Sequence, residues 1–362
     1  MRKKALRMTP RELFQNIMHY GEYHRMPVWH WTGWAETLER WKQEGMPEDA
    51  AKHLEYLNAE SMPWGVPVDL GLWPGFPEET LEETKAYKII RQGDGVVAKH
   101  SKVGSTIPQY TDFLLKDRSM WPEYKKRLQP DPQRIPDHID ETLANLKASN
   151  QPISFPTGSM VGWLRNWMGA HNFCITCCED PDFVAEVADT VANLVCWGID
   201  QIAPKIAIDV GWGWEDICFK TGPLIQPWAF QYAAVPGYRK ISDKLRSYGC
   251  DLHVIDSDGR IDELAPLWLE GGVNVLFPVE IGTWQADPMA FRRKYGKELR
   301  IIGGIDKLVL ERGRAAIDAE IERRKPLMAE GGFIPLPDHI ITPGTPLEDY
   351  RYYLDRIRAL RF

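Results

Sequence analysis

The sequence predicts an α/β protein in which eight parallel strands close into a (β/α)8 barrel, with an extra N-terminal helix and an insertion after the second strand. Three observations lead to this prediction. The 362 residues suffice for one large barrel. Strand-like and helix-like patterns alternate along the chain, which favours parallel strands joined by right-handed crossovers. Eight strand-like runs can be counted, and eight strands close a barrel.

The N-terminal part of the chain contains one helix and two strand-like runs. The helix is predicted over 8–19, because Thr9 can cap it, Pro10 suits its first turn and apolar residues recur at helical spacing. The strand-like runs that follow are 28–31 and 64–68, with helical patterns at 34–44 and 47–58 between them. Two prolines predict that the second strand is short or irregular.

Residues 74–130 are the least regular part of the chain. Short β-like runs at 86–90 and 95–99 lie between proline and glycine residues. We expect this segment to leave the main fold as a small hairpin that covers one mouth of the barrel. The whole chain, 1–362, is expected to form a single domain.

The remainder of the chain is regular after a helix predicted at 138–148. Strands are predicted at 152–157, 206–211, 252–256, 273–279, 299–303 and 332–336, and helices at 179–203, 227–248, 260–270, 286–295, 313–330 and 346–360. A doubly wound open sheet is the alternative architecture. It is disfavoured because no strand is followed by the glycine fingerprint of a dinucleotide site, and Gly303-Gly304 is too short to be one.

Composition excludes several classes of function. The net charge is -7 and no basic run carries interleaved aromatic residues, so we expect no nucleic-acid partner. The basic N-terminus lacks the apolar core of a signal peptide, and no apolar stretch could span a membrane. We therefore expect a cytoplasmic protein. Cys174, Cys177 and Cys178 could bind zinc or act in redox chemistry, but no second pair lies nearby, so buried structural cysteines are expected.

Polar and aromatic side chains follow most of the predicted strands, and in a barrel they would converge at one end. The candidates are Trp31, Asp69, Trp163, Asn166, Trp214, Glu215, Asp216, Lys220, His253, Asp256, Asp258, Asp306 and His339. Two histidines and several carboxylates could hold a divalent metal with an open coordination position. They could equally form an acid–base set around an organic substrate.

Some of these residues also have structural explanations. Asp256 and Asp258 precede Gly259 and could serve as turn and helix-cap residues. Asp306 could cap the helix after it. Glu215 lies in an aromatic context, and its burial would raise its affinity for a proton. His253 alternates with Ile255, so one of the two could simply face the barrel interior.

Five motifs, in this order, resemble the uroporphyrinogen decarboxylase superfamily. They are Arg25-x-Pro-Val-Trp, Asp69 with Pro74, Gly158-Ser-Met with Trp163, Gly303-Gly-Ile-Asp306, and Gly332-Phe-Ile-x-x-Pro-Asp-His339-x-x-x-Pro-x-Thr-Pro346. The resemblance runs over nearly the whole chain and implies a (β/α)8 barrel. Homodimerisation is also what the resemblance implies.

Decarboxylases of this superfamily use an aspartate after strand two, arginines after strand one and a histidine in the last loop. Asp69 and His339 resemble that aspartate and histidine. The arginines are absent, because Trp29-His-Trp-Thr-Gly-Trp34 occupies their place. A polycarboxylate substrate would therefore leave charges unpaired in a Trp-rich pocket.

Methyltransferases of the superfamily pass a methyl group to or from a corrinoid protein and hold zinc by a His-x-Cys motif and a later cysteine. His253 matches the histidine, whereas Ile255 and His339 occupy the positions of the two cysteines. A metal here, zinc or another divalent ion, would need harder ligands. The candidates are His253, Glu215, Asp256, Asp258 and His339.

We therefore predict a methyltransferase or demethylase that acts on a small methylated substrate, with a corrinoid protein as partner and a divalent metal. The predicted catalytic residues are Asp69, His339, Glu215 and Lys220. The predicted substrate-binding residues are Trp31, Trp163, Asn166, Trp214, Asp216 and Asp306. One alternative is a cofactor-free decarboxylase of a porphyrinogen or another carboxylic acid. The other is a protein that binds a tetrapyrrole or corrinoid without turnover.

Overall fold

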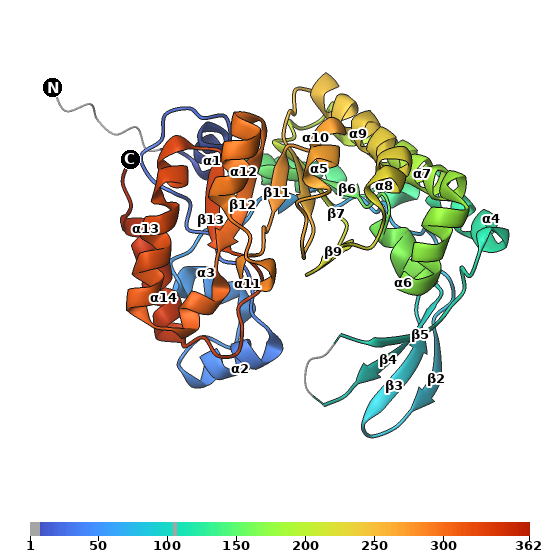
Figure 1. The fold of residues 1–362 in the computed structure, drawn as a ribbon, viewed down its shortest axis with the longest axis horizontal. Coiled ribbons are helices and arrows are strands. Elements are labelled where there is room, and N and C mark those ends of the chain that lie inside the picture. Colours follow the sequence, from blue (N-terminus) through green and yellow to red (C-terminus); the bar gives the residue numbers. More distant parts are fainter. Residues whose placement is uncertain (1–7, 104–106) are drawn as a thin grey trace. The chain divides into compact units, whose positions relative to one another are not determined.

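The computed structural model describes residues 8–103 and 107–362. The chain folds into two compact units. Unit 1 comprises Met1–Trp64, Ala144–Ser154 and Asn274–Phe362, and unit 2 comprises Gly65–Leu143 and Phe155–Val273. Strands alternate with helices in both units, which confirms the α/β class (Figure 1). Seven of the eight expected barrel strands occur among the described residues, and closure into a (β/α)8 barrel stays a prediction.

Unit 1 is built on three neighbouring parallel strands, β11 (Val275–Phe277), β12 (Arg300–Ile305) and β13 (Phe333–Pro337). All residues of β11 and β13 are buried, as expected for parallel strands covered on both faces. The helices of this unit are α1 (Pro10–Met18), α2 (Ala35–Gln43), η1 (Ala50–Lys52), α3 (His53–Tyr56), α11 (Ile281–Trp284), α12 (Pro288–Tyr295), η5 (Gly296–Glu298), η6 (Lys307–Glu311), α13 (Arg314–Glu330) and α14 (Leu347–Ala359).

The prediction of a regular strand at 28–31 is wrong. This segment forms only two isolated parallel bridges, Trp29 with Glu60 and Gly33 with Ile341. Successive parts of the segment thus pair with different neighbours, which prevents a continuous ladder with either. The second predicted strand, 64–68, is reduced to β1 (Trp64–Gly65), in line with the expected effect of its prolines.

Unit 2 contains β7 (Val210–Trp214) and β10 (His253–Asp256), which pair in parallel from His253 with Gly211 to Asp256 with Trp214. Strand β6 (Ile153–Gly158) begins in unit 1 and ends in unit 2 beside β7. The helices of unit 2 are η2 (Arg118–Met120), α4 (Trp121–Lys125), η3 (Lys126–Leu128), η4 (Pro132–Arg134), α6 (Gly162–Glu179), α7 (Pro181–Ile202), α8 (Pro227–Ala233), α9 (Val235–Ser247) and α10 (Ala265–Glu270). Helix α5 (Ile139–Ala148) spans the boundary of the two units.

Strand β7 begins four residues later than predicted. Its two glycines, Gly211 and Gly213, do not give the sequence pattern of a strand. A Cβ on Gly213 would lie 2.7 Å from Thr157 Oγ1, and a Cβ on Gly211 would lie 2.5 Å from Leu245 Cδ1. Glycine is therefore needed where β7 lies close to its neighbours, although it is a weak strand former.

The insertion is larger than the predicted hairpin. It contains an antiparallel sheet in the order β2 (Glu79–Glu83), β3 (Tyr87–Arg91), β4 (Val96–Ser101) and β5 (Gln109–Phe113) (Figure 1). The hairpin predicted from 86–90 and 95–99 corresponds to β3 and β4. The outer strands were missed because β2 is exposed along its whole length and polar except at Leu81, and β5 is exposed along most of its length.

Three predicted helices differ clearly in extent from those observed. The helix predicted at 47–58 is reduced to η1 and the four-residue α3. The helix predicted at 227–248 is divided into α8 and α9, and Pro236 lies in the first turn of α9. The helix predicted at 260–270 is reduced to α10. A search of residues 8–103 and 107–362 finds no helix with the length and apolar character that crossing a membrane requires.

Candidate active site

Three carboxylates lie at the carboxyl ends of β7 and β10 in unit 2. Asp256 is the last residue of β10 and pairs with Trp214 at the end of β7. Asp258 follows two residues later, and its backbone N–H lies 3.4 Å from Asp216 Oδ1, which accepts a hydrogen bond. Asp216 has a φ of 51°, a left-handed conformation that is uncommon for a residue with a Cβ. We call Asp216, Asp256 and Asp258 the carboxylate cluster.

The carboxyl group of Asp256 has an unusually high pKa. Burial, with the nearby charges of Asp258 and Asp216, raises the pKa of its carboxyl group to about 8. Asp256 is therefore mostly protonated at neutral pH. It can donate a proton there, a property needed in a general acid.

Glu215 precedes the carboxylate cluster but has a different environment. Its side chain is fully buried and binds the start of α6. The donors to its carboxylate are the N–H groups of Met160 (2.7 Å), Val161 (3.1 Å) and Gly162 (2.6 Å) and the hydroxyl groups of Ser159 (2.8 Å) and Tyr238. Burial raises the pKa of Glu215, while these hydrogen bonds lower it. Both carboxylate oxygens are thus engaged in positioning α6.

His253 is buried at the start of β10, and both of its ring nitrogens have hydroxyl partners. Nδ1 lies 2.9 Å from Ser242 Oγ, and Nε2 lies 3.0 Å from Thr157 Oγ1. Burial lowers the pKa of the imidazole to about 3, with a smaller contribution from Arg246. The ring is therefore neutral at physiological pH.

These contacts do not fit the predicted metal ligand set. A metal ligand must direct a free lone pair at the ion, but the nitrogens of His253 and the oxygens of Glu215 are directed at protein donors and hydroxyl groups. Across residues 8–103 and 107–362, no three His, Cys, Asp or Glu side chains are grouped as a metal site requires. The metal predicted from the sequence therefore has no support in the geometry.

The other predicted residues of unit 2 have varied surroundings. Asp69 is exposed, and its Oδ1 accepts a hydrogen bond from the N–H of Gly71 at 2.9 Å, which forms a turn. Lys220 is exposed between β8 (Cys218–Phe219) and β9 (Gly222–Pro223). Trp163 stacks on Trp167 with ring centroids 6.0 Å apart. Asn166 lies on α6 and lines a cavity.

In unit 1, His339 lies in a cluster of aromatic rings. Its ring centroid is 5.8 Å from that of Trp31 and 6.3 Å from that of Trp34, and Trp31 also contacts Phe277 at 5.0 Å. Such rings form a flat, largely apolar surface. Asp306 has a structural role as well, because its Oδ1 accepts a hydrogen bond from the N–H of Leu308 at the start of η6.

Three further polar side chains lie just after the strands of unit 1. Asp338 is buried and accepts hydrogen bonds from the N–H groups of Ile281 (2.6 Å) and Lys307 (3.0 Å). Burial raises the pKa of Asp338. Lys307 Nζ lies 3.6 Å from Glu280 Oε1 in a largely buried pair. Lys307 was not among the candidate site residues predicted from the sequence. Its position two residues after the end of β12 could have identified it.

Comparisons of sequence and of structure each found a similar protein. No protein-family model matches the chain. Over 183 residues it is 23% identical to a uroporphyrinogen decarboxylase from Picosynechococcus sp. (strain ATCC 27264 / PCC 7002 / PR-6), an alignment that covers 49% of this chain. The chain thus spans about half (47%) of the length of that curated relative.

A methyltransferase from Methanosarcina mazei has a similar fold. The TM-score is 0.63 at 15% identity, and the match covers 97% of this chain and 98% of the other. At this identity the likeness concerns the fold alone. The sequence likeness to the curated relative supports the resemblance to the uroporphyrinogen decarboxylase superfamily that the motifs indicated.

Proposed function

We propose that this protein is an enzyme of the uroporphyrinogen decarboxylase superfamily that removes a methyl group from a small methylated compound. The observation that carries the proposal is the burial of Asp256 at the carboxyl end of β10 beside Asp216 and Asp258, which raises the pKa of its carboxyl group to about 8. Strand ends of this kind hold the catalytic residues of α/β barrels. The fold shared with a methyltransferase supports this reaction class.

In the proposed reaction, an electron pair of the methyl acceptor forms a new bond to the methyl carbon while the bond between that carbon and its heteroatom breaks. The heteroatom keeps the electron pair of the broken bond. Asp256 gives its proton to that heteroatom, so the product leaves as a neutral alcohol, amine or thiol. The ionised Asp256 then recovers a proton from water. The half-buried Trp214, which pairs with Asp256 across the two strands, supplies an apolar surface for the substrate.

The acceptor of the methyl group is proposed from the family resemblance to be a corrinoid carried by a partner protein. The proposal assigns no metal ion to this chain itself, because His253 and Glu215, two of the candidate ligands, are directed at protein groups. Asp69, Lys220 and His339 remain predicted catalytic residues, and Asn166 remains a predicted substrate-binding residue. Homodimerisation also remains a prediction.

The test is a methyl-transfer assay with free cob(I)alamin as acceptor and a panel of methylated phenols, amines and thiols as donors. Formation of methylcobalamin is followed by absorbance. Asp256→Asn should lower the rate by about 10²–10⁴-fold, because it removes the proton donor. The exposed Asp137 provides a matched control, and Asp137→Asn should leave the rate unchanged.

The pH dependence gives an independent readout. The rate should fall as the pH rises through about 8, because the proton donor is then lost. Full activity of Asp256→Asn, or a rate that does not fall above that pH, would contradict the role proposed for Asp256.

Decarboxylation is the second candidate, favoured by the sequence likeness to uroporphyrinogen decarboxylase. Here the bond to the carboxylate breaks, carbon dioxide leaves, and the carbon keeps the electron pair and receives the proton of Asp256. Release of carbon dioxide from uroporphyrinogen, with no methyl transfer from any donor, would favour this reaction. A protein that binds a tetrapyrrole without turnover would show neither product.

We also propose that the strands close into a (β/α)8 barrel. Support comes from residues 29–33, which form parallel bridges to Glu60, ahead of β1, and to Ile341, beyond β13. A segment held between the first and last strands of the sequence is what barrel closure requires. An experimental structure with an open sheet would contradict this proposal.

A further inference from the structure

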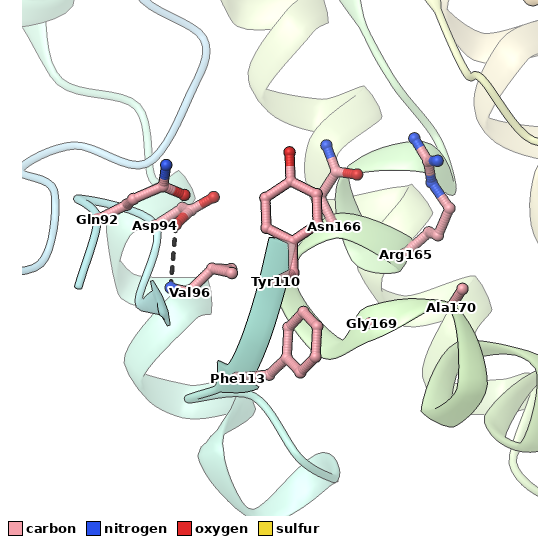
Figure 2. Close-up of a pocket in the computed structure, with 9 residues that line it drawn as sticks. All are labelled: Gln92, Asp94, Val96, Tyr110, Phe113, Arg165, Asn166, Gly169 and Ala170. Atoms are coloured by element: carbon pink, nitrogen blue, oxygen red, sulfur yellow. Dashed lines mark hydrogen bonds between the residues drawn. The ribbon is translucent and has the colours of Figure 1, made fainter. Parts of the chain in front are cut away.

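A cavity of about 140 Å³ lies within unit 2, between the insertion sheet and α6 (Figure 2). Gln92 and Asp94 line it from the turn that joins β3 to β4, and Val96 lines it from the start of β4. Tyr110 and Phe113 of β5 form a second wall. The third wall is the part of α6 that contains Arg165, Asn166, Gly169 and Ala170.

A break in α6 helps to form this cavity. Gly169 has a φ of 78° and a ψ of 149°, which are not helical values. The ring of Phe113 packs at this break, so closely that a Cβ on Gly169 would lie 2.6 Å from it. The ring of Phe113 on β5 is therefore in direct contact with the backbone of α6 at this break.

Arg165 is a cation with no partner in the part of the chain that the structure describes. Nothing there forms an ion pair with its guanidinium, and its buried Nε has no hydrogen-bond acceptor. A buried donor without an acceptor is costly, and a guanidinium group is suited to binding a carboxylate through two hydrogen bonds. The neighbouring Asn166 is exposed and adds an amide donor to the same wall.

The opposite wall carries the opposite charge. Asp94 is half-buried, and its Oδ1 accepts a hydrogen bond from the N–H of Val96 at 3.0 Å, which leaves further acceptor capacity on the carboxylate. Figure 2 shows Asp94 and Arg165 on opposite sides of the set of residues that line the cavity, with Tyr110 and Asn166 between them. The two aromatic rings provide apolar surface for the carbon atoms of a ligand.

We propose that this cavity binds a small zwitterion of amino-acid size, with its carboxylate at Arg165 and Asn166 and its ammonium group at Asp94. The volume corresponds to about four or five water molecules, which is the size of such a ligand. A simple anion would be repelled by Asp94 and a simple cation by Arg165, whereas a zwitterion is attracted at both ends.

The proposal is tested by calorimetric titration of the full-length protein with glycine, alanine and serine. Propionate and ethylamine serve as probes that carry one charge each. At least one amino acid should bind at least about tenfold more tightly than either probe, because only the amino acid pairs with both walls. Equal binding of propionate or ethylamine, or no binding of any amino acid at about 10 mM, would overturn the proposal.

Two variants make the test specific. Arg165→Gln should weaken binding of the amino acid about tenfold. Asp94→Asn should also weaken it but should strengthen binding of propionate, because the repulsion is removed. An unchanged affinity in Arg165→Gln, or weaker propionate binding in Asp94→Asn, would contradict the assignment of the two walls.

Arg239→Gln is a matched control for Arg165→Gln, since Arg239 lies on α9 and forms an exposed ion pair with Glu270. It should leave amino-acid binding unchanged. Circular dichroism of each variant checks that it is folded. The titration measures binding without turnover, so its outcome is independent of the proposed methyl transfer.

Discussion

Glu215 and Asp256 are neighbours in unit 2, but their surroundings give one a structural role and the other a chemical role. The buried Glu215 is surrounded by donors from the start of α6 and from Tyr238. Asp256 instead has two other carboxylates as its electrostatic neighbours. The first arrangement stabilises the fold around a carboxylate, and the second makes ionisation of the carboxylate unfavourable.

The raised pKa of Asp256 predicts a pH-dependent stability. Its usual pKa is 3.8, so the unfolded chain ionises there, while the folded protein keeps the proton to about pH 8. The free energy of unfolding therefore falls as the pH rises from about 4 to 8. Asp256→Asn does not titrate, and it should be more stable than the parent protein by ~1–3 kcal/mol at pH 8, with little difference near pH 4. Urea unfolding at both pH values measures this, and a variant that is less stable at pH 8 would contradict the prediction.

Glu215 is predicted to be essential for stability. Glu215→Ala should lower the free energy of unfolding by ~3 kcal/mol or more, because several buried donors lose their acceptor. Tyr238→Phe, which removes only one of the donors, should cost ~1 kcal/mol. Urea unfolding compares the two variants, and equal losses would show that the bonds to α6 are not the main contribution.

Among the elements, α6 has the most influence on the proposed sites. Its first turn is bound by Glu215, and its break at Gly169 contacts Phe113 of β5. The helix thus connects the strand ends of unit 2 to the insertion sheet. A change at the break should affect both the stability of unit 2 and the cavity.

Gly169→Ala tests the importance of this break. The substitution should destabilise the protein by ~2–4 kcal/mol, through the positive φ of 78° and the clash with Phe113. Gly249 has a similar φ of 84°, and a Cβ added there would have no atom within 4 Å. Gly249→Ala should therefore cost only ~1 kcal/mol, the backbone contribution alone. Thermal unfolding of the two variants separates backbone strain from steric overlap, and similar losses would exclude the clash as a cause.

Sequence patterns predicted the elements well where burial and secondary structure favour the same residues. Strand β10 was predicted almost to its ends because Val254 and Ile255 are apolar and buried. Strand β7 was misplaced because Gly211 and Gly213 are required by close contacts that a sequence does not reveal. The exposed strands β2 and β5 carry no apolar alternation, so their pairing could not be predicted.

At the scale of the whole molecule, the rule that sites lie at the ends of strands correctly indicated where the carboxylate cluster lies. The rule did not show which carboxylate has which role. The sequence contains Glu215 and Asp216 side by side, and only the structure shows that the first is buried and the second exposed. The partners of His253, Ser242 and Thr157, are distant in sequence and could not be inferred. Tertiary contacts of this kind decide whether a polar residue binds a ligand or the protein itself.

The contacts of His253 and Glu215 predict that neither side chain binds a divalent metal. Both are directed at protein groups, so metal analysis of the purified protein should find no zinc that depends on them. Treatment with EDTA should leave the melting temperature and the methyl-transfer rate unchanged. Zinc at one equivalent that disappears in His253→Ala would contradict this expectation.

The two buried carboxylates also indicate how such a protein could be redesigned. Glu215 holds the start of α6 in unit 2, and Asp338 holds backbone groups after β11 and β12 in unit 1. Mutant libraries that aim at a new substrate should keep these two residues fixed and vary half-buried positions such as Trp214 and His339. Diversity would then be introduced into side chains that can face a ligand, while the backbone that presents them stays intact.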